Sequence, residues 1–210
     1  MTAGPRIAVV DYGAGNLVSI EQALTSVGAT VALVGDAEAL DACDAVIVPG
    51  VGAAGPAMER LDQAGLADPI RDWLRADRPF LGICLGLQLL FDSSEEDGTP
   101  TLAAIPGVTR RLADAPTLPH IGWNQVQRRR DHRLLDGIED GADFYFVHSY
   151  AGAPDIDEAD AVVVADTTHG RPFVSVVARG HTLGVQFHPE RSGSDGLRLL
   201  ANFVELVKVA

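Results

Sequence analysis

Cysteine is scarce in this sequence, since Cys43 and Cys84 are the only two among 210 residues. Two thiols cannot supply the disulfide framework that stabilises small secreted domains, and we expect both to be reduced. The sequence also lacks an apolar run of the roughly 18 residues needed to cross a membrane, and the run at residues 7–10 is too short for a signal peptide. These absences predict a cytoplasmic protein with no membrane span.

Positive charge is also in short supply. The chain has 16 Lys and Arg against 29 Asp and Glu, which gives a net charge of −13 at pH 7. Nonspecific binding to nucleic acid needs the opposite field, so we expect no nucleic-acid partner. One basic cluster, Arg128 to Arg133, is either a solvated loop or hairpin or a contact with an acidic partner.

Apolar residues make up 47% of the chain, enough for the core of a single domain covering residues 1–210. Its first half alternates strands with helices, and its second half contains strand-like segments that favour antiparallel pairing. This order predicts a three-layer α/β fold with a mixed sheet. Strands are predicted at 6–13, 30–35, 44–50, 79–83, 122–127, 143–150, 161–167, 172–180 and 181–188, and helices at 16–28, 68–77, 85–91 and 196–209.

Several of these elements carry more detailed expectations. Strands 30–35 and 44–50 are β-branched runs suited to burial on both faces. Helix 16–28 has Asn16 as its N-cap and Gly28 as its stop. The last helix should bury one face, made of Leu197, Leu200, Val204 and Val207.

The segment "GICLG" places Cys84 between Gly82 and Gly86, where a strand gives way to a helix. This is the cysteine form of the nucleophile elbow, in which small neighbours relieve the crowding around a strained residue. The N-terminus of the following helix favours a thiolate. A buried structural cysteine explains the pentapeptide equally well.

The segment "GVQFHPE" changes that balance towards catalysis. Pro189 keeps His188 extended, and in an extended chain His188 and Glu190 share a face. A nucleophilic cysteine needs a base, and the base needs a carboxylate to orient it. Cys84, His188 and Glu190 therefore form a candidate Cys-His-Glu triad.

Two glycine-rich turns complete the set of motifs. In "VPGVGAAG", Gly50 and Gly52 would let backbone N–H groups approach a ligand, as an oxyanion hole requires. In "DYGAGNLV", Gly13 and Gly15 begin a dinucleotide-binding pattern, but Val18 stands where its third glycine belongs. The six histidines show no metal-ligand spacing, so we expect neither a metal nor a cofactor.

Taken together, these motifs resemble the class I glutamine amidotransferases. Further segments resemble one branch of that family, the glutaminase subunits of imidazole glycerol phosphate synthases. The resemblance runs from the first strand to the last helix and implies a mostly parallel central sheet. The segments are "DYGAGN", "PGVGA", "GICLGLQLLF", "PHIGWN", "FYFVHSY" and "HPERSG".

The resemblance implies a role for each candidate residue. Cys84 would attack the side-chain amide of L-glutamine, with His188 as proton shuttle and Glu190 as its orienting carboxylate. The remaining roles are an oxyanion hole from Leu85 and the turn Gly50, Val51 and Gly52; substrate contacts from Gln88, His148, Ser149 and Tyr150; and a partner interface with His120, Trp123, Asn124 and Arg191. The partner would be a (β/α)8-barrel cyclase subunit, forming a heterodimer that receives the ammonia.

The chain departs from this branch at three positions: Ala54 replaces Phe, Leu87 replaces Met and Arg191 replaces Lys. The first puts local packing near the oxyanion turn in doubt, and the third alters a possible interface charge contact. Alternatives are the glutaminase of pyridoxal phosphate synthase, the amidotransferase of anthranilate or aminodeoxychorismate synthase, and a non-catalytic partner-binding α/β module.

Overall fold

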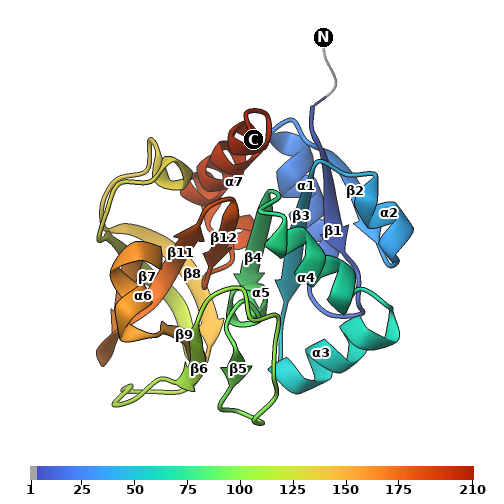
Figure 1. Ribbon diagram of the computed structural model, residues 1–210. Helices are drawn as coiled ribbons and strands as arrows, with labels where there is room; N and C mark the ends of the chain where they lie inside the picture. The colour runs from blue at the N-terminus through green and yellow to red at the C-terminus, as the bar shows by residue number, and fades with distance from the viewer. Residues whose placement is uncertain (1–3) are drawn as a thin grey trace.

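A nine-stranded mixed sheet forms the centre of the protein in the computed structural model, which describes residues 4–210 (Figure 1). Its strand order is β2-β1-β3-β4-β12-β11-β10-β7-β8. The strands are β1 (Arg6–Val10), β2 (Thr30–Val34), β3 (Ala45–Gly50), β4 (Phe80–Cys84), β7 (His120–Arg128), β8 (Ala142–His148), β10 (Val163–His169), β11 (Arg171–Arg179) and β12 (Thr182–Val185).

The strand directions confirm the predicted division of the chain. Strands β2, β1, β3, β4 and β12 run parallel to their neighbours, and the β12–β11, β11–β10, β10–β7 and β7–β8 pairs are antiparallel. A second sheet of three strands, β5-β6-β9, lies beside the antiparallel half (Figure 1). Its strands are β5 (Ser93–Ser94), β6 (Gly107–Arg111) and β9 (Tyr150–Pro154).

Helices cover both faces of the parallel half and make the expected three layers. Alternate residues of β1 show this directly: Ile7 and Val9 belong to the core that contains α1 and α7, whereas Ala8 and Val10 belong to the core that contains α3 and α4. The helices are α1 (Leu17–Ser26), α2 (Ala37–Asp41), α3 (Ala54–Gln63), α4 (Ala67–Arg75), α5 (Leu85–Gln88), α6 (Ile156–Val162) and α7 (Gly193–Val207), with short 3-10 turns at Arg133–Leu135 and Pro189–Arg191.

Several local expectations hold. Asn16 caps α1 through a hydrogen bond from the Ser19 N–H, and Gly28 adopts a positive φ just after the helix ends. Helix α4 buries Ile70, Trp73 and Leu74 as the periodicity predicts. The described part of the chain contains no helix long and apolar enough to cross a bilayer.

Three local expectations are wrong. Strand β2 is an edge strand and is not buried on both faces, since Leu33 is 49% exposed. Leu197 is partly exposed, because α7 turns Leu199 and Phe203 towards the core instead. Helix α5 ends at Gln88, because the carbonyls of Leu89 to Phe91 accept hydrogen bonds from the N–H groups of residues 102–105.

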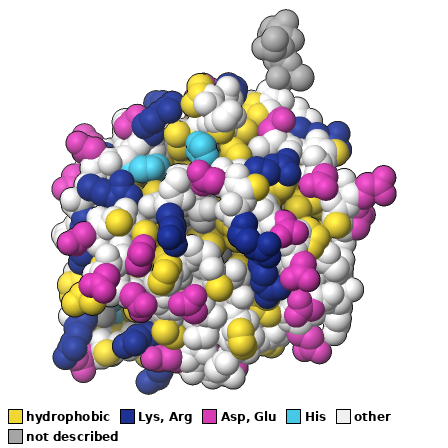
Figure 2. Space-filling view, viewed as in Figure 1, with side chains coloured by type: hydrophobic (Ala, Val, Ile, Leu, Met, Phe, Trp, Pro, Cys, Tyr) yellow, Lys and Arg dark blue, Asp and Glu magenta, His cyan; other side chains and the backbone are white. Residues whose placement is uncertain are grey.

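Acidic and basic side chains are interspersed over the face shown in Figure 2. Within the basic cluster, several guanidinium groups bind nearby backbone: Arg128 donates to the Leu135 carbonyl and Arg130 to the carbonyls of Val163 and Ala178. Arg129 pairs with Asp166. The cluster is therefore a loop that ties β7 to its neighbours.

The turn between β4 and α5 has no room for side chains on its glycines. A Cβ on Gly86 would lie 1.8 Å from the Val48 carbonyl oxygen, and one on Gly82 would lie 2.4 Å from the Gly86 oxygen. Both obstacles are backbone atoms, which cannot rotate away. The two glycines flanking Cys84 therefore allow β3, β4 and α5 to pack closely enough to form the elbow.

Gly86→Ala should consequently lower the free energy of unfolding by about 3 kcal/mol, because the added methyl group overpacks a backbone contact. Gly35→Ala is the matched control, since its Cβ would meet nothing closer than the Asp11 oxygen at 3.7 Å. Urea denaturation of the two variants measures the difference. Equal stabilities would contradict this account of the turn.

Candidate active site

Cys84 occupies the last position of β4 in a backbone conformation that non-glycine residues rarely adopt. Its φ and ψ are 54° and −105°, and such strain concentrates at functional sites. The residue is 4% exposed and directly precedes the first turn of α5. The structure thus places Cys84 at a strand-to-helix elbow, as the "GICLG" pattern predicts.

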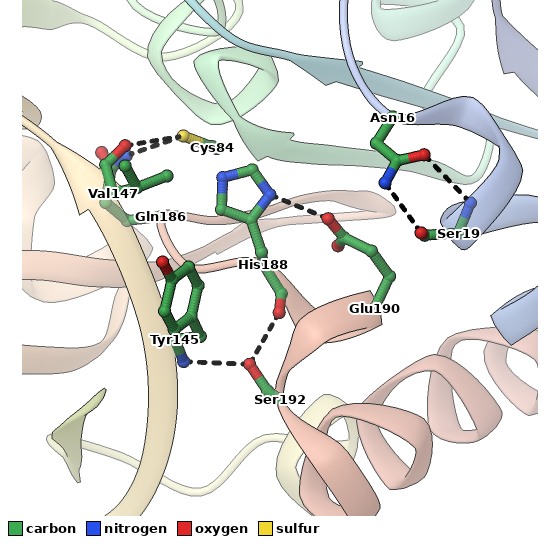
Figure 3. A network of polar contacts seen from close by, with 9 residues as sticks. All are labelled: Asn16, Ser19, Cys84, Tyr145, Val147, Gln186, His188, Glu190 and Ser192. Atoms are coloured by element: carbon green, nitrogen blue, oxygen red, sulfur yellow. Dashed lines mark hydrogen bonds and ion pairs between the residues drawn. The ribbon is translucent and has the colours of Figure 1, made fainter. Parts of the chain in front are cut away.

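His188 and Glu190 form a buried pair beside this elbow (Figure 3). His188 Nδ1 lies 2.9 Å from Glu190 Oε1, and their side chains are 7% and 2% exposed. The backbone of His188 is extended, as expected before Pro189, but Glu190 lies in a 3-10 turn. The two side chains therefore meet because the chain turns after His188, and the expectation of a shared extended face is wrong.

The protonation of His188 depends on its two neighbours. Burial by itself lowers the pKa of His188, but its interactions with Cys84 and Glu190 outweigh this and raise the pKa to about 10. The Nε2 atom, on the side of the ring opposite the Glu190 contact, has no hydrogen-bond partner among the described residues. A protonated ring with one free donor can deliver a proton to a bound molecule.

The backbone around His188 is held from both sides. Its N–H donates to the Tyr145 carbonyl at 2.9 Å, and its carbonyl accepts from Ser192 Oγ at 2.6 Å. Ser192 Oγ in turn accepts from the Tyr145 N–H at 3.0 Å (Figure 3). These hydrogen bonds fix the position of the His188 backbone, from which the imidazole side chain extends. Sequence reasoning missed the supporting role of Ser192, although this residue lies in the "HPERSG" motif.

A cavity of about 340 Å³ opens over Cys84. Most of the residues expected around a substrate share it, together with Glu96, which sequence reasoning missed because "SSEEDG" contains no recognisable motif. Its lining is Val51, Gly52, Ala53, Cys84, Leu85, Gln88, Glu96, Pro119, Val147, His148, Ser149 and Tyr150. Burial and the neighbouring Asp97 raise the pKa of Glu96.

The oxyanion candidates gather around Cys84. Gly50 pairs with Cys84 in the β3–β4 register, and a Cβ on Gly50 would clash with Tyr12 and Leu85. Val51 and Gly52 follow at the cavity wall, where Val51 is 49% exposed and Gly52 has a φ of +92°. Gly50 itself lines a second, smaller cavity together with His188. Gly15 and Asn16 of the "DYGAGN" loop line the same cavity.

The side chains of Gln88 and Gln186 form a series of polar contacts from the cavity wall to the Cys84 sulfur. Gln88 Nε2 donates to the Tyr150 carbonyl at 2.7 Å and to Gln186 Oε1 at 3.2 Å. Gln186 is fully buried, and its Nε2 lies 3.7 Å from Cys84 Sγ. Gln186 was missed because an amide inside "GVQFHPE" carries no signal of where it points.

His148 and His120 contribute to the site in a different way from the expected one. Both ring nitrogens of His148 are engaged, Nδ1 with the Tyr150 carbonyl at 2.8 Å and Nε2 with His120 Nδ1 at 3.2 Å. His148 therefore has no ring nitrogen free for a substrate. His120 is 4% exposed, so its expected place on the partner surface is wrong.

The remaining interface candidates do lie at the surface. Trp123 is 57% exposed and its ring meets that of Tyr145. The Arg191 guanidinium lies over the Tyr145 ring, 4.2 Å from its centroid. Asn124 is half-buried next to them on β7. Ala54 and Leu87, the other two positions at which the chain departs from the family pattern, are both buried in the core.

No group of His, Cys, Asp or Glu in residues 4–210 has an arrangement that could hold a metal ion. The chemistry available at this site is that of a thiol at the cavity wall and a buried imidazole–carboxylate pair beside it. Such an arrangement can attack an acyl carbon, donate a proton to the leaving group and activate water in the second step.

Comparisons with known proteins agree with this geometry. The family model for class I glutamine amidotransferases matches residues 8–207. Two solved structures share the fold: a glutamine amidotransferase, with a TM-score of 0.75, 21% identity and coverage of 96% of this chain and 98% of that chain, and PurLQS from Thermotoga maritima, with a TM-score of 0.73, 21% identity and coverage of 97% and 99%. The chain therefore belongs to the class I glutamine amidotransferases.

Curated relatives identify the branch. The imidazole glycerol phosphate synthase subunit HisH of Chloroflexus aurantiacus is 49% identical over 203 residues and that of Moorella thermoacetica is 47% identical over 205, with 94% to 97% of each chain covered. Within its class, the chain belongs to this family of HisH subunits. The relatives are named as subunits, which implies a partner subunit.

The shifted pKa values of the histidines predict that pH affects the stability of the protein in opposite directions, through His120 and His148 on one side and His188 on the other. Burial lowers the pKa of His148 to about 3, and burial with the nearby His169 lowers that of His120 to about 4. These rings bind fewer protons folded than unfolded, so their contribution to stability falls as the pH drops from about 6.5 through these values. His188 has a raised pKa, so its contribution is complete below about 6.5 and is lost as the pH rises through about 10.

Unfolding free energies from urea titrations at pH 4 to 10 test this prediction. His188→Gln should flatten the alkaline limb of the stability profile, and His148→Gln should flatten part of the acid limb. An alkaline limb that is identical in His188→Gln and in the parent would contradict the assignment.

Proposed function

We propose that this chain is the glutaminase subunit of an imidazole glycerol phosphate synthase. It hydrolyses L-glutamine to glutamate and ammonia and passes the ammonia to a (β/α)8-barrel cyclase subunit. That subunit converts the phosphoribulosyl-formimino carboxamide intermediate, PRFAR, to imidazole glycerol phosphate and AICAR in histidine biosynthesis. The observation that carries the proposal is the buried His188–Glu190 pair beside the strained Cys84.

The chemistry proceeds in two halves. The Cys84 sulfur attacks the side-chain carboxamide carbon of glutamine, and the tetrahedral intermediate collapses when His188 gives its proton to the departing ammonia. His188 then takes a proton from water, which attacks the thioester and releases glutamate and the thiol. Glu190 holds Nδ1–H of His188, so that Nε2 exchanges the proton throughout.

The negative oxygen of the intermediate needs backbone donors. The N–H of Leu85, at the start of α5, is one, and the Gly50 to Gly52 turn supplies the other. Because glycine flanks Val51 on both sides, the peptides around Val51 can reorient. Our prediction is that this donor turns inward only when the partner and its substrate bind, which would prevent wasted glutamine.

The cavity offers complementary groups for the rest of the substrate. Both N–H groups of the Gln88 amide are used inside the protein, so Gln88 offers only Oε1, an acceptor for substrate N–H. Glu96 places a carboxylate where the α-ammonium group can pair with it. Ser149 and Tyr150 also line the cavity and would contact the α-carboxylate.

The partner would dock on a surface that includes the exposed Trp123 and Arg191 together with the half-buried Asn124. Pro119, which precedes β7, lines the cavity together with Cys84. The other amidotransferases considered from the sequence, and the non-catalytic module, have no observation in their favour. The cytoplasmic location remains a prediction.

Cys84→Ala should abolish glutamine-dependent turnover in the complex with the cyclase subunit, because no other group can form the thioester. Turnover driven by added ammonia should be unchanged, since that reaction bypasses Cys84. Steady-state rates of product formation with each nitrogen source give the answer.

Cys43→Ala is the matched control, because Cys43 is also buried but donates only to the Ala39 carbonyl of its own helix region. It should retain both activities. If Cys84→Ala still used glutamine, the nucleophile would be assigned wrongly.

Glu190→Gln should lower glutamine-dependent kcat by about a hundredfold, because an amide no longer stabilises the imidazolium of His188. The same variant should lower the pKa of His188 from its value of about 10. NMR titration of the ring reports the second effect independently of turnover. A parental titration of His188 would show that Glu190 does not set its protonation.

A further inference from the structure

The Cys84 sulfur has two polar neighbours that the triad does not use. The Val147 carbonyl oxygen lies 4.0 Å from Sγ, and Gln186 Nε2 lies 3.7 Å from it. Figure 3 shows both contacts leaving the sulfur on one side, while the His188 ring lies on another. A carbonyl can only accept a hydrogen bond and an amide N–H can only donate one, so the two neighbours favour different states of the sulfur. Val147 suits the thiol, and Gln186 suits the thiolate.

Neighbouring groups determine which way the Gln186 side-chain amide points, that is, which end carries its oxygen and which its nitrogen. The Tyr150 carbonyl requires a donor, so the atom of Gln88 that lies 2.7 Å from it must be the amide nitrogen. That same nitrogen lies 3.2 Å from the Gln186 amide, which must therefore present its oxygen. The nitrogen of Gln186 is left facing Cys84. A flipped Gln186 would put two N–H groups against each other and an oxygen against the sulfur.

A second branch of hydrogen bonds leads from β7 to the Tyr150 carbonyl by way of His148, the last residue of β8. His148 Nδ1, 2.8 Å from the Tyr150 oxygen, must carry a proton. The neutral ring then accepts at Nε2 from His120 Nδ1, and His120 accepts at Nε2 from Asn124 Nδ2 at 3.1 Å. The other N–H of Asn124 donates to the Thr168 carbonyl at 2.9 Å.

Burial favours the neutral rings that this pattern needs, because it lowers the pKa of both His120 and His148. In each of these hydrogen bonds, therefore, only one of the two groups can be the donor. Hydrogen bonds run without a break from Asn124 on β7 to the sulfur of Cys84. Links of this kind, satisfied at every member, rigidify the groups they join.

We propose that Gln186 is a positioning residue for the nucleophile, held in its donating orientation by Gln88, whose own orientation is fixed by the Tyr150 carbonyl. Its N–H steadies the Cys84 thiolate before attack, on the side away from His188. The inference rests on the proposed function, because it assigns a partner to the sulfur that function requires.

Gln186→Met and Gln186→Glu test the proposal in the full-length chain. The first keeps the length of the side chain and removes the donor, and the second places an anionic oxygen at the sulfur. Alkylation of Cys84 by iodoacetamide, followed by mass spectrometry of the peptide that contains it, measures the thiolate without turnover. We expect the rate at pH 7 to fall about tenfold in Gln186→Met and further in Gln186→Glu, since a hydrogen bond to a charged group is lost.

Two further readouts separate positioning from a general loss of structure. The alkylation profile of Gln186→Met should shift to higher pH and approach the parental rate there. In the complex with the cyclase subunit, glutamine-dependent kcat should fall by a similar factor while KM stays within about twofold. Gln63→Met, the same change at an exposed position of α3, should leave all three measurements at parental values.

Histidine ¹⁵N NMR of the unmodified chain tests the hydrogen-bond directions in the branch through His148 and His120 without relying on any variant. His120 and His148 should both carry their proton on Nδ1, with Nε2 unprotonated. A proton on Nε2 of His148 would contradict the branch through His148 and His120, and a parental alkylation profile in Gln186→Met would overturn the proposal. Either result would leave the proposed function standing, because that function fails only if Cys84→Ala still uses glutamine.

Discussion

The site depends on one strand pairing, that between β4 and β12. Val185 is in register with Ile83, so the residues that follow each strand emerge side by side at the same edge of the sheet. Cys84 ends one strand, and Gln186 and His188 follow the other. Segments a hundred residues apart in sequence are thereby brought within hydrogen-bond reach, and the parallel and antiparallel halves become one sheet.

Much of this could be read from the sequence because the signals are local. Glycines at fixed offsets predict the elbow around Cys84, and Pro189 predicts the extended backbone of His188. Alternation of apolar residues gives the strands, and the cap and stop at Asn16 and Gly28 give the first helix. The catalytic grouping followed from chemistry, since a nucleophile requires a base and a base requires a carboxylate.

The errors occur where tertiary neighbours decide the outcome. An apolar run cannot show that Leu33 lies on an edge strand or that backbone donors from residues 102–105 end the helix after Gln88. A motif places His120 near a partner but cannot show that stacking against Phe146 and His169 buries it. The direction of the Gln186 amide depends on Gln88 and Tyr150, and no window of sequence contains all three.

The position of β12 has a consequence for the chain during its synthesis. The nucleophile lies on β4, and its base follows the central strand β12, about a hundred residues later in the chain. A nascent chain ending before residue 182 has an unpaired edge on β4 and a thiol without a proton acceptor. The site therefore cannot form until β12 and the segment after it have been synthesised and β12 has paired with β4.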